Sequence, residues 1–75
     1  MPRKAAETTK AARAVFGRRL HKLREARGWS QEALADKAEV SQALLSSLES
    51  SVKQPGWGTV QRLADALEVG VQEFR

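Results

Sequence analysis

The sequence contains no cysteine, only one histidine (His21) and no long apolar run. The lack of cysteine excludes a disulfide framework and a cysteine-ligated metal, and one histidine argues against a histidine zinc site. A membrane-spanning helix needs roughly 18 or more apolar residues in a row, and no segment approaches that length. We therefore expect no metal and no membrane partner. We also predict no cofactor, and no small-molecule ligand is evident from the sequence.

The sequence also lacks a recognisable catalytic constellation. There is no cysteine nucleophile, His21 lies beside basic residues, and the acidic residues are scattered at helix-surface spacing. A catalytic site needs a nucleophile or base with a partner that orients it. We predict that the protein is not an enzyme.

Charge is distributed unevenly along the chain. The formal net charge of the 75 residues is +4, but residues 1–27 carry nine lysines and arginines against two glutamates, and the remainder is net acidic. Such asymmetry fits a protein that approaches a polyanion from one side. A solvated basic helix with a loose tail explains it equally well.

Apolar periodicity predicts an all-α fold, a compact bundle of about five short helices. Residues 1–8 are basic and have no periodicity, so we interpret them as a mobile arm, and residues 9–75 as one domain. The first helix is expected to start after Thr8 or Thr9. Its apolar stripe is predicted to be Ala12, Phe16, Leu20, Leu23 and Ala26.

Two glycines punctuate this first segment. Gly17 lies inside the predicted helix, where glycine costs about 1 kcal/mol relative to alanine. We therefore expect another helix to approach it closely. Gly28 is expected to end the helix in a left-handed conformation. Trp29 then precedes Ser30 in the position of a hydrophobic staple.

Two serines predict the start of the next two helices. Ser30 and Ser41 each precede a short apolar-periodic run, so each is expected to cap a helix N-terminus. The second helix should end near Ala38 and the third near Ser50, with Glu39 and Val40 between them. Two short apolar faces so close in sequence share a core only if the helices cross steeply, which predicts a helix-turn-helix.

Proline and glycine mark residues 51–58 as a loop. A fourth helix is expected from Trp57 or Thr59 to Leu67, followed by a last turn from Val71 to Phe74. Its buried residues are predicted to be Val60, Leu63, Ala64 and Leu67.

Four short motifs follow one another in the order and spacing of a known domain type. They are LREARGWSQ at residues 23–31, LADKA at 34–38, VSQ at 40–42 and LADALEV at 63–69. With them, residues 16–74 resemble the phage-repressor/Cro type of helix-turn-helix domain (XRE-like). This resemblance implies a DNA-binding transcriptional regulator that acts as a repressor. It also implies a location in the cytoplasm, in association with the nucleoid. Its partner would be double-stranded DNA.

The resemblance implies that the third helix enters the major groove. Its base-facing positions would be Gln42, Ala43, Ser46 and Ser47. A glutamine amide pairs in two places with adenine, and an alanine packs on a thymine methyl group. An exposed glutamine at a helix start is also ordinary surface chemistry.

The positions implied to contact phosphates are Gln31, Ser41, Ser50 and Lys53. Such contacts set the register of the protein on the duplex and carry no sequence information. For Ser41, helix capping is the stronger interpretation. Arg24 and Glu49 match a family ion pair that orients the recognition helix, and a direct phosphate contact by Arg24 is the alternative.

The sequence departs from the family pattern in three places. Glu39 and Ser51 stand where many members have glycine, and a left-handed conformation costs such residues roughly 1–2 kcal/mol. We therefore expect a slightly remodelled turn. In addition, no lysine or arginine lies between Val40 and Val52, which weakens the expectation of tight DNA binding.

The family resemblance further implies a homodimer on an inverted-repeat operator. The candidate interface residues are Trp57, Val71 and Phe74, with core packing as an equally good interpretation of each. The alternative function is a protein-interaction module, or an antitoxin-type partner-binding protein, that keeps the fold with weak DNA recognition.

Overall fold

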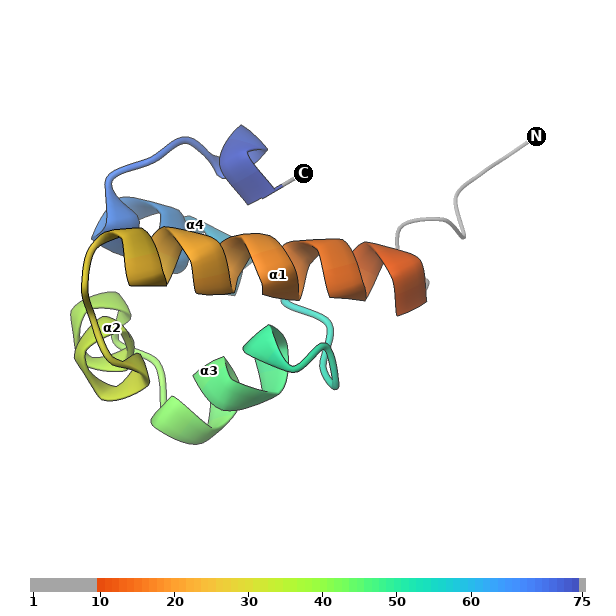
Figure 1. The fold of residues 1–75 in the computed structure, drawn as a ribbon, viewed down its shortest axis with the longest axis horizontal. Helices are drawn as coiled ribbons and strands as arrows, with labels where there is room; N and C mark the ends of the chain where they lie inside the picture. The colour runs from red at the N-terminus through yellow and green to blue at the C-terminus, as the bar shows by residue number, and fades with distance from the viewer. Residues whose placement is uncertain (1–9, 75) are drawn as a thin grey trace.

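The computed structural model describes residues 10–74, which form four α-helices, one 3-10 helix and no strand (Figure 1). The elements are α1 (Lys10–Ala26), α2 (Gln31–Ala38), α3 (Gln42–Glu49), α4 (Trp57–Leu67) and η2 (Val71–Phe74). The predicted all-α bundle is confirmed. The predicted arm at residues 1–8 and the cap at Thr8 or Thr9 lie outside the described residues. No helix within residues 10–74 is long and apolar enough to cross a bilayer.

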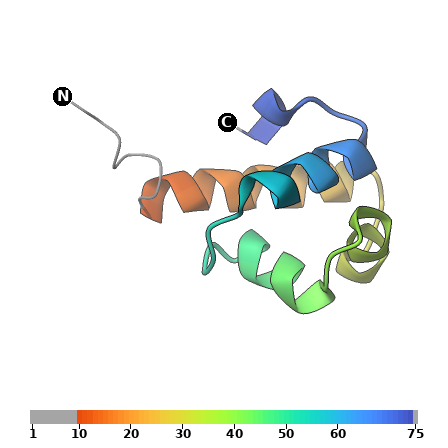
Figure 2. The same ribbon diagram turned by 180° about the vertical axis from the view of Figure 1, so that it is seen from behind.

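The longest helix, α1, runs along the length of the bundle (Figure 1). In Figure 1 α3 lies below α1, η2 lies above it, and α2 stands beside its C-terminal end. Figure 2 shows the opposite side, where α4 passes in front of α1 and packs against α2. The two helices of the helix-turn-helix therefore share one side of the domain, and α3 is its outermost element on that side.

Leucines from all four α-helices build the core. The fully buried side chains are Leu20, Leu34, Leu45, Leu48, Leu63 and Leu67. At one end of this core the rings of Phe16 and Phe74 pack with their centroids 5.0 Å apart. Each fully buried leucine contributes about 1.5–3 kcal/mol through removal of its surface from water, so the short helices are held mainly by this shared core.

The predicted stripe of α1 is correct at Phe16 and Leu20 and wrong at Ala26, which is exposed. At about 100° per residue, Ala26 lies about 120° around the helix from Leu20. The buried face instead includes Arg24, whose residue exposure is only 9%. The apolar pattern missed this residue because a charged side chain occupies a buried position.

Every α-helix ends in the same hydrogen-bonded turn. After α2, the Glu39 N–H donates to the Asp36 carbonyl (3.2 Å) and the Val40 N–H to the Ala35 carbonyl (3.0 Å), which is the Schellman arrangement. Equivalent turns follow α1 at Gly28, α3 at Ser51 and α4 at Glu68.

The remodelled turn expected from Glu39 and Ser51 is not present. Both residues adopt the left-handed conformation, with φ of 60° and 67°. The two hydrogen bonds of each turn offset the strain. After Glu39, Val40 also packs against the core. A glycine is therefore not required for this turn.

Gly17 lies where α1 crosses the C-terminal end of α3. A Cβ atom at this position would stand 2.6 Å from the Leu48 carbonyl oxygen and 2.9 Å from that of Glu49. Both are backbone atoms of a packed helix, so neither can move aside cheaply. The expected close approach of another helix is confirmed.

We predict that Gly17→Ala destabilises the fold by about 1–3 kcal/mol, because the overpacking outweighs the better helix propensity of alanine. Gly58→Ala is the matched control, since Gly58 also lies in a helix and its Cβ would meet nothing within 4 Å. Gly58→Ala should be neutral or slightly stabilising. Urea unfolding measures both, and a Gly17→Ala variant as stable as the wild type would contradict the packing account.

Candidate nucleic-acid interface

A serine caps the N-terminus of each helix of the helix-turn-helix. The Ser30 hydroxyl accepts a hydrogen bond from the Ala33 N–H (3.1 Å), and the Ser41 hydroxyl accepts one from the Leu44 N–H (3.0 Å). Both predicted caps are confirmed. The Ser41 oxygen is thus already engaged in starting α3, in agreement with its interpretation as a cap.

The outward face of α3 presents small or polar side chains to solvent. Gln42, Ala43 and Ser46 are exposed, while Leu45 and Leu48 on the opposite face are fully buried. Ser47, the fourth predicted base-facing residue, is half-buried, so it projects less than the other three. The outward surface of α3 is consequently small, polar and uncharged.

The C-terminal end of α3 holds two of the predicted phosphate-contacting residues. The Ser50 hydroxyl donates to the Ser46 carbonyl at 2.9 Å and remains exposed. Lys53 is exposed, and its backbone N–H donates to the Ser47 carbonyl at 3.3 Å. Lys53 therefore places a cation at the end of a helix whose outward face carries none.

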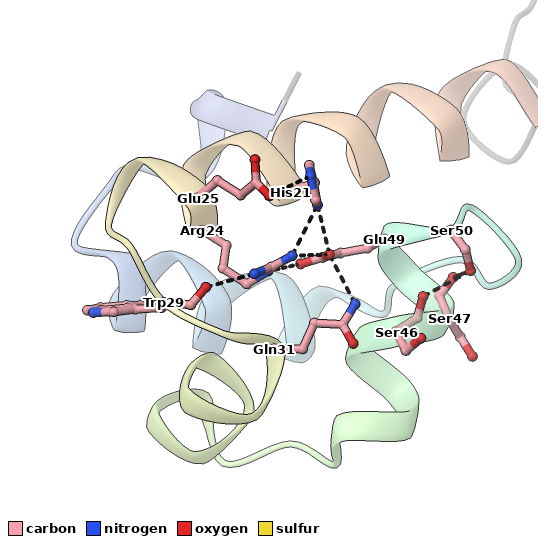
Figure 3. Close-up of polar contacts among 9 residues, drawn as sticks. All are labelled: His21, Arg24, Glu25, Trp29, Gln31, Ser46, Ser47, Glu49 and Ser50. Atoms are coloured by element: carbon pink, nitrogen blue, oxygen red, sulfur yellow. Dashed lines mark hydrogen bonds and ion pairs between the residues drawn. The ribbon is translucent and has the colours of Figure 1, made fainter.

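The carboxylate of Glu49, the last residue of α3, is the centre of a polar cluster. The Arg24 Nε donates to Glu49 Oε2 at 2.7 Å, and its Nη2 donates to Glu49 Oε1 at 3.0 Å. The Arg24 Nη1 donates to the Trp29 carbonyl at 2.7 Å. Figure 3 shows the guanidinium lying between this carbonyl and the carboxylate. Arg24 therefore ties α1 to α3 and to the turn before α2.

Two further side chains complete the cluster. The Gln31 amide donates to Glu49 Oε1 at 3.2 Å, and His21 Nδ1 lies 3.1 Å from the same oxygen (Figure 3). The opposite ring nitrogen, His21 Nε2, lies 3.2 Å from Glu25 Oε2. One carboxylate on α3 thus receives partners from both α1 and α2.

The cluster shifts the pKa values of its central pair. Burial raises the pKa of Glu49, but the hydrogen bonds from Arg24, His21 and Gln31 together outweigh it, so this pKa lies below its ordinary value. The hydrogen bond to Glu49 raises the pKa of Arg24 above its ordinary value. Both groups are therefore held in their charged forms.

Sequence reasoning identified Arg24 and Glu49 but missed His21 and assigned Gln31 to a phosphate. In the structure the Gln31 amide faces Glu49, so its nitrogen serves the cluster. The available signal for His21 was its spacing, because residues three and four apart share a helix face. His21, Arg24 and Glu25 have this spacing.

The three candidate interface residues have different environments. Trp57 is 61% exposed in the first turn of α4. Val71 is half-buried and packs against the core. Phe74 is 5% exposed and lies against Phe16. Core packing is the interpretation that the structure supports for Phe74 and for much of Val71, because η2 folds back onto α1.

We predict that Arg24→Met destabilises the protein by about 3 kcal/mol or more, because the Glu49 carboxylate would be left buried without its main partner. Arg18→Met is the matched control, since Arg18 is exposed on the same helix. Its effect should stay within about 0.5 kcal/mol. Equal effects of the two substitutions in urea unfolding would show that the cluster does not stabilise the fold.

We predict that Glu49 contributes to acid unfolding. Since its pKa is lower in the folded chain than in the unfolded one, its contribution is present above the ordinary carboxyl value of about 4.3 and is lost as pH falls through the lower folded value. The free energy of unfolding should therefore fall less steeply with acid in Glu49→Gln than in the wild type. Identical slopes below pH 5 would contradict this.

Comparison with known proteins agrees with this geometry. A model of the helix-turn-helix domain family matches residues 15–75. The HTH-type transcriptional regulator YazB of Bacillus subtilis, itself uncharacterized, is 29% identical over 60 residues, which cover 80% of this chain and 87% of YazB. The crystal structure of the restriction-modification controller protein C.AhdI from Aeromonas hydrophila superposes with a TM-score of 0.84 at 31% identity, covering 87% of this chain and 98% of that one. The chain belongs to the helix-turn-helix domain family, as a member of its phage-repressor/Cro type.

Proposed function

We propose that this protein is a transcriptional regulator, acting as a repressor, that reads a specific sequence of double-stranded DNA as a homodimer. The observation that carries the proposal is the exposed, uncharged outward face of α3, which begins at Gln42 and is held at its other end by the buried Glu49 cluster. An α-helix fits the major groove of B-DNA, where the base edges present distinguishable hydrogen-bonding patterns. A rigidly held helix is what such reading needs.

Base reading is assigned chiefly to Gln42. Its exposed amide stands at the first position of α3 and offers both a donor and an acceptor, which match adenine N6 and N7. Ala43 and Ser46 are exposed beside it and would lie against neighbouring base edges. Ser47, being half-buried, is assigned a smaller part.

Phosphate binding is assigned to groups around α3, because α3 itself has no cation. The N-terminus of α2 offers backbone N–H groups and the positive end of a helix dipole. Ser50 and Lys53 are exposed at the other end of α3. In this proposal Gln31 keeps its amide on Glu49 and contributes to phosphate binding through its backbone.

The dimer interface is assigned to the loop before α4 and the start of that helix. Trp57 is 61% exposed, and Val52, which lies in the same loop region, is 74% exposed. These are the exposed large apolar residues among residues 10–74. A tryptophan that is exposed in the monomer is a common anchor in protein interfaces, so Trp57 is the one of the three predicted interface residues to test.

A protein-interaction module is the second candidate function. The observation that favours it is the uncharged outward face of α3, since phosphate contacts by lysine and arginine normally supply most non-specific DNA affinity. The two functions differ in salt dependence. DNA binding weakens steeply as salt rises, whereas binding through an apolar interface does not.

We predict that purified protein enriches an inverted repeat from a randomised duplex pool, with half-site centres about 10 base pairs apart. Gln42→Ala should lose the preference at one position of each half-site, worth about 1–3 kcal/mol of discrimination. Gln61→Ala is the matched control, because Gln61 is exposed on α4, away from α3. The Gln61→Ala variant should enrich the same DNA sequence as the wild-type protein does.

Two results would contradict the assignment. Enrichment of nothing above background at low salt would reject DNA reading by this chain alone and would favour the protein-interaction function. If the wild type and Gln42→Ala enrich the same DNA sequence, DNA binding by the protein stands. The assignment of base reading to Gln42 is then rejected.

We predict that Trp57→Ala weakens the homodimer roughly thirtyfold, the effect of losing an interface anchor worth about 2 kcal/mol. Sedimentation equilibrium of the two proteins measures this. Circular dichroism should show unchanged helix content, because Trp57 is largely exposed. A wild type that stays monomeric at high concentration would exclude a dimer formed in the absence of DNA.

A further inference from the structure

We propose that the exposed basic face of α1 docks an acidic protein segment that carries an apolar side chain between its carboxylates. This α1 basic face consists of Arg18, Arg19 and Lys22, which are exposed on the longest helix. The inference goes beyond the proposed DNA reading, because it assigns a partner to a surface that lies away from α3. The proposed DNA contacts use none of these three residues.

The charge of the α1 basic face is not neutralised within the domain. None of its three cations makes an ion pair with another residue of the described range 10–74. Arg18 and Lys22 are four residues apart and Arg19 and Lys22 are three apart, so like charges lie side by side on one helix surface and repel one another. A partner of opposite charge relieves this repulsion.

Other surface cations of the domain contact the domain itself. Arg27 Nη1 lies 3.8 Å from a carboxylate oxygen of Glu68. Lys37 Nζ lies 4.8 Å from the centroid of the Trp29 ring. Arg62 Nη1 donates at 3.3 Å to the backbone carbonyl at the end of α2. Within residues 10–74, the cations of the α1 basic face have no comparable contact, so the fold does not account for their being gathered there.

Two adjacent hollows shape the α1 basic face. The first, of about 260 Å³, is lined by Val15 and all three cations. The second, of about 150 Å³, is lined by Arg19, Lys22, Leu23 and Glu73. Glu73 makes no ion pair with either cation in the part of the chain that the structure describes. Val15 and Leu23 are half-buried, so each hollow offers apolar surface beside its cations, which suits an apolar side chain flanked by carboxylates.

The direction of the α1 basic face favours a protein partner over DNA. Gly17 is the point at which α1 meets α3, because a Cβ atom there would stand 2.6 Å from the Leu48 carbonyl oxygen. At about 100° per residue, Arg19 and Lys22 lie roughly 160° and 140° around α1 from Gly17. A duplex bound by α3 therefore leaves this face free. In addition, a phosphate backbone matches its charge but supplies no apolar side chain for the hollows.

The experiment titrates the isotope-labelled full chain, without DNA, with an oligo-glutamate peptide and with the same peptide carrying one central leucine. Amide resonances report both the position and the Kd of binding. We expect the largest changes on α1 between Val15 and Leu23, with α3 unaffected. The leucine peptide should bind about fourfold more tightly than the all-glutamate peptide, the effect of burying apolar surface equal to one methylene group.

Two double variants separate a docking face from general charge attraction. Arg19→Gln with Lys22→Gln should weaken binding of the leucine peptide about three- to tenfold, the effect of losing two exposed ion pairs. Lys10→Gln with Lys53→Gln is the matched control, because it removes the same charge from exposed positions outside the face. It should change the Kd less than about twofold. Circular dichroism should show the same helix content in all three proteins, since every substituted side chain is exposed.

Three results would overturn the proposal. Equal weakening by the two double variants would show general charge attraction, and equal affinity for the two peptides would show that the hollows accept no apolar side chain. A selected duplex that displaces the peptide and shifts the same amides of α1 would show that DNA occupies the face. If the wild type selects no duplex, the proposed DNA reading fails separately, because the peptide titrations contain no DNA and still test the α1 basic face.

Discussion

The orientation of α3 depends on one buried carboxylate at the junction of three helices. The Glu49 carboxylate, at the end of α3, is largely removed from water, and this desolvation alone would favour its neutral form. A buried charge is tolerated only when its oxygen atoms are hydrogen-bonded. Arg24, His21 and Gln31 meet that requirement from α1 and α2. Satisfying this one group therefore fixes how three helices meet.

Close packing and helix ends complete this arrangement. Gly17 lets the backbone of α1 approach that of α3, which keeps Glu49 within reach of Arg24. Left-handed turns after all four α-helices satisfy carbonyl groups and redirect the chain within one or two residues. A domain of this size has a small core, so its short helices gain much from such local restraints.

Much of the fold followed from local sequence patterns. The serine caps, the glycine after α1 and the periodicity of α4 act within a few residues of one another, and each was predicted near its observed position. The exposed turn of α3 at Gln42 and Ala43, and the pairing of Arg24 with Glu49, followed from the family resemblance. The position of Gly17 against another helix followed from its cost inside α1.

The remaining features depend on contacts between distant segments. His21 meets Glu49 across 28 residues, and no local pattern specifies that pairing. Ala26 is exposed and Arg24 is buried because the face of α1 is set by the helices that pack on it. Glu39 and Ser51 keep the turn geometry of glycine because hydrogen bonds and Val40 packing offset the strain.

The central claim is that the cluster at Glu49 presents the first turn of α3 to DNA. It is tested most directly by titrating isotope-labelled protein with the selected duplex and following its amide resonances. The account predicts that the largest changes fall on Gln42, Ala43 and Ser46 and on the start of α2, while Gln61 and Ala66 on α4 change little. Changes centred on the exposed face of α1, with α3 unaffected, would contradict it.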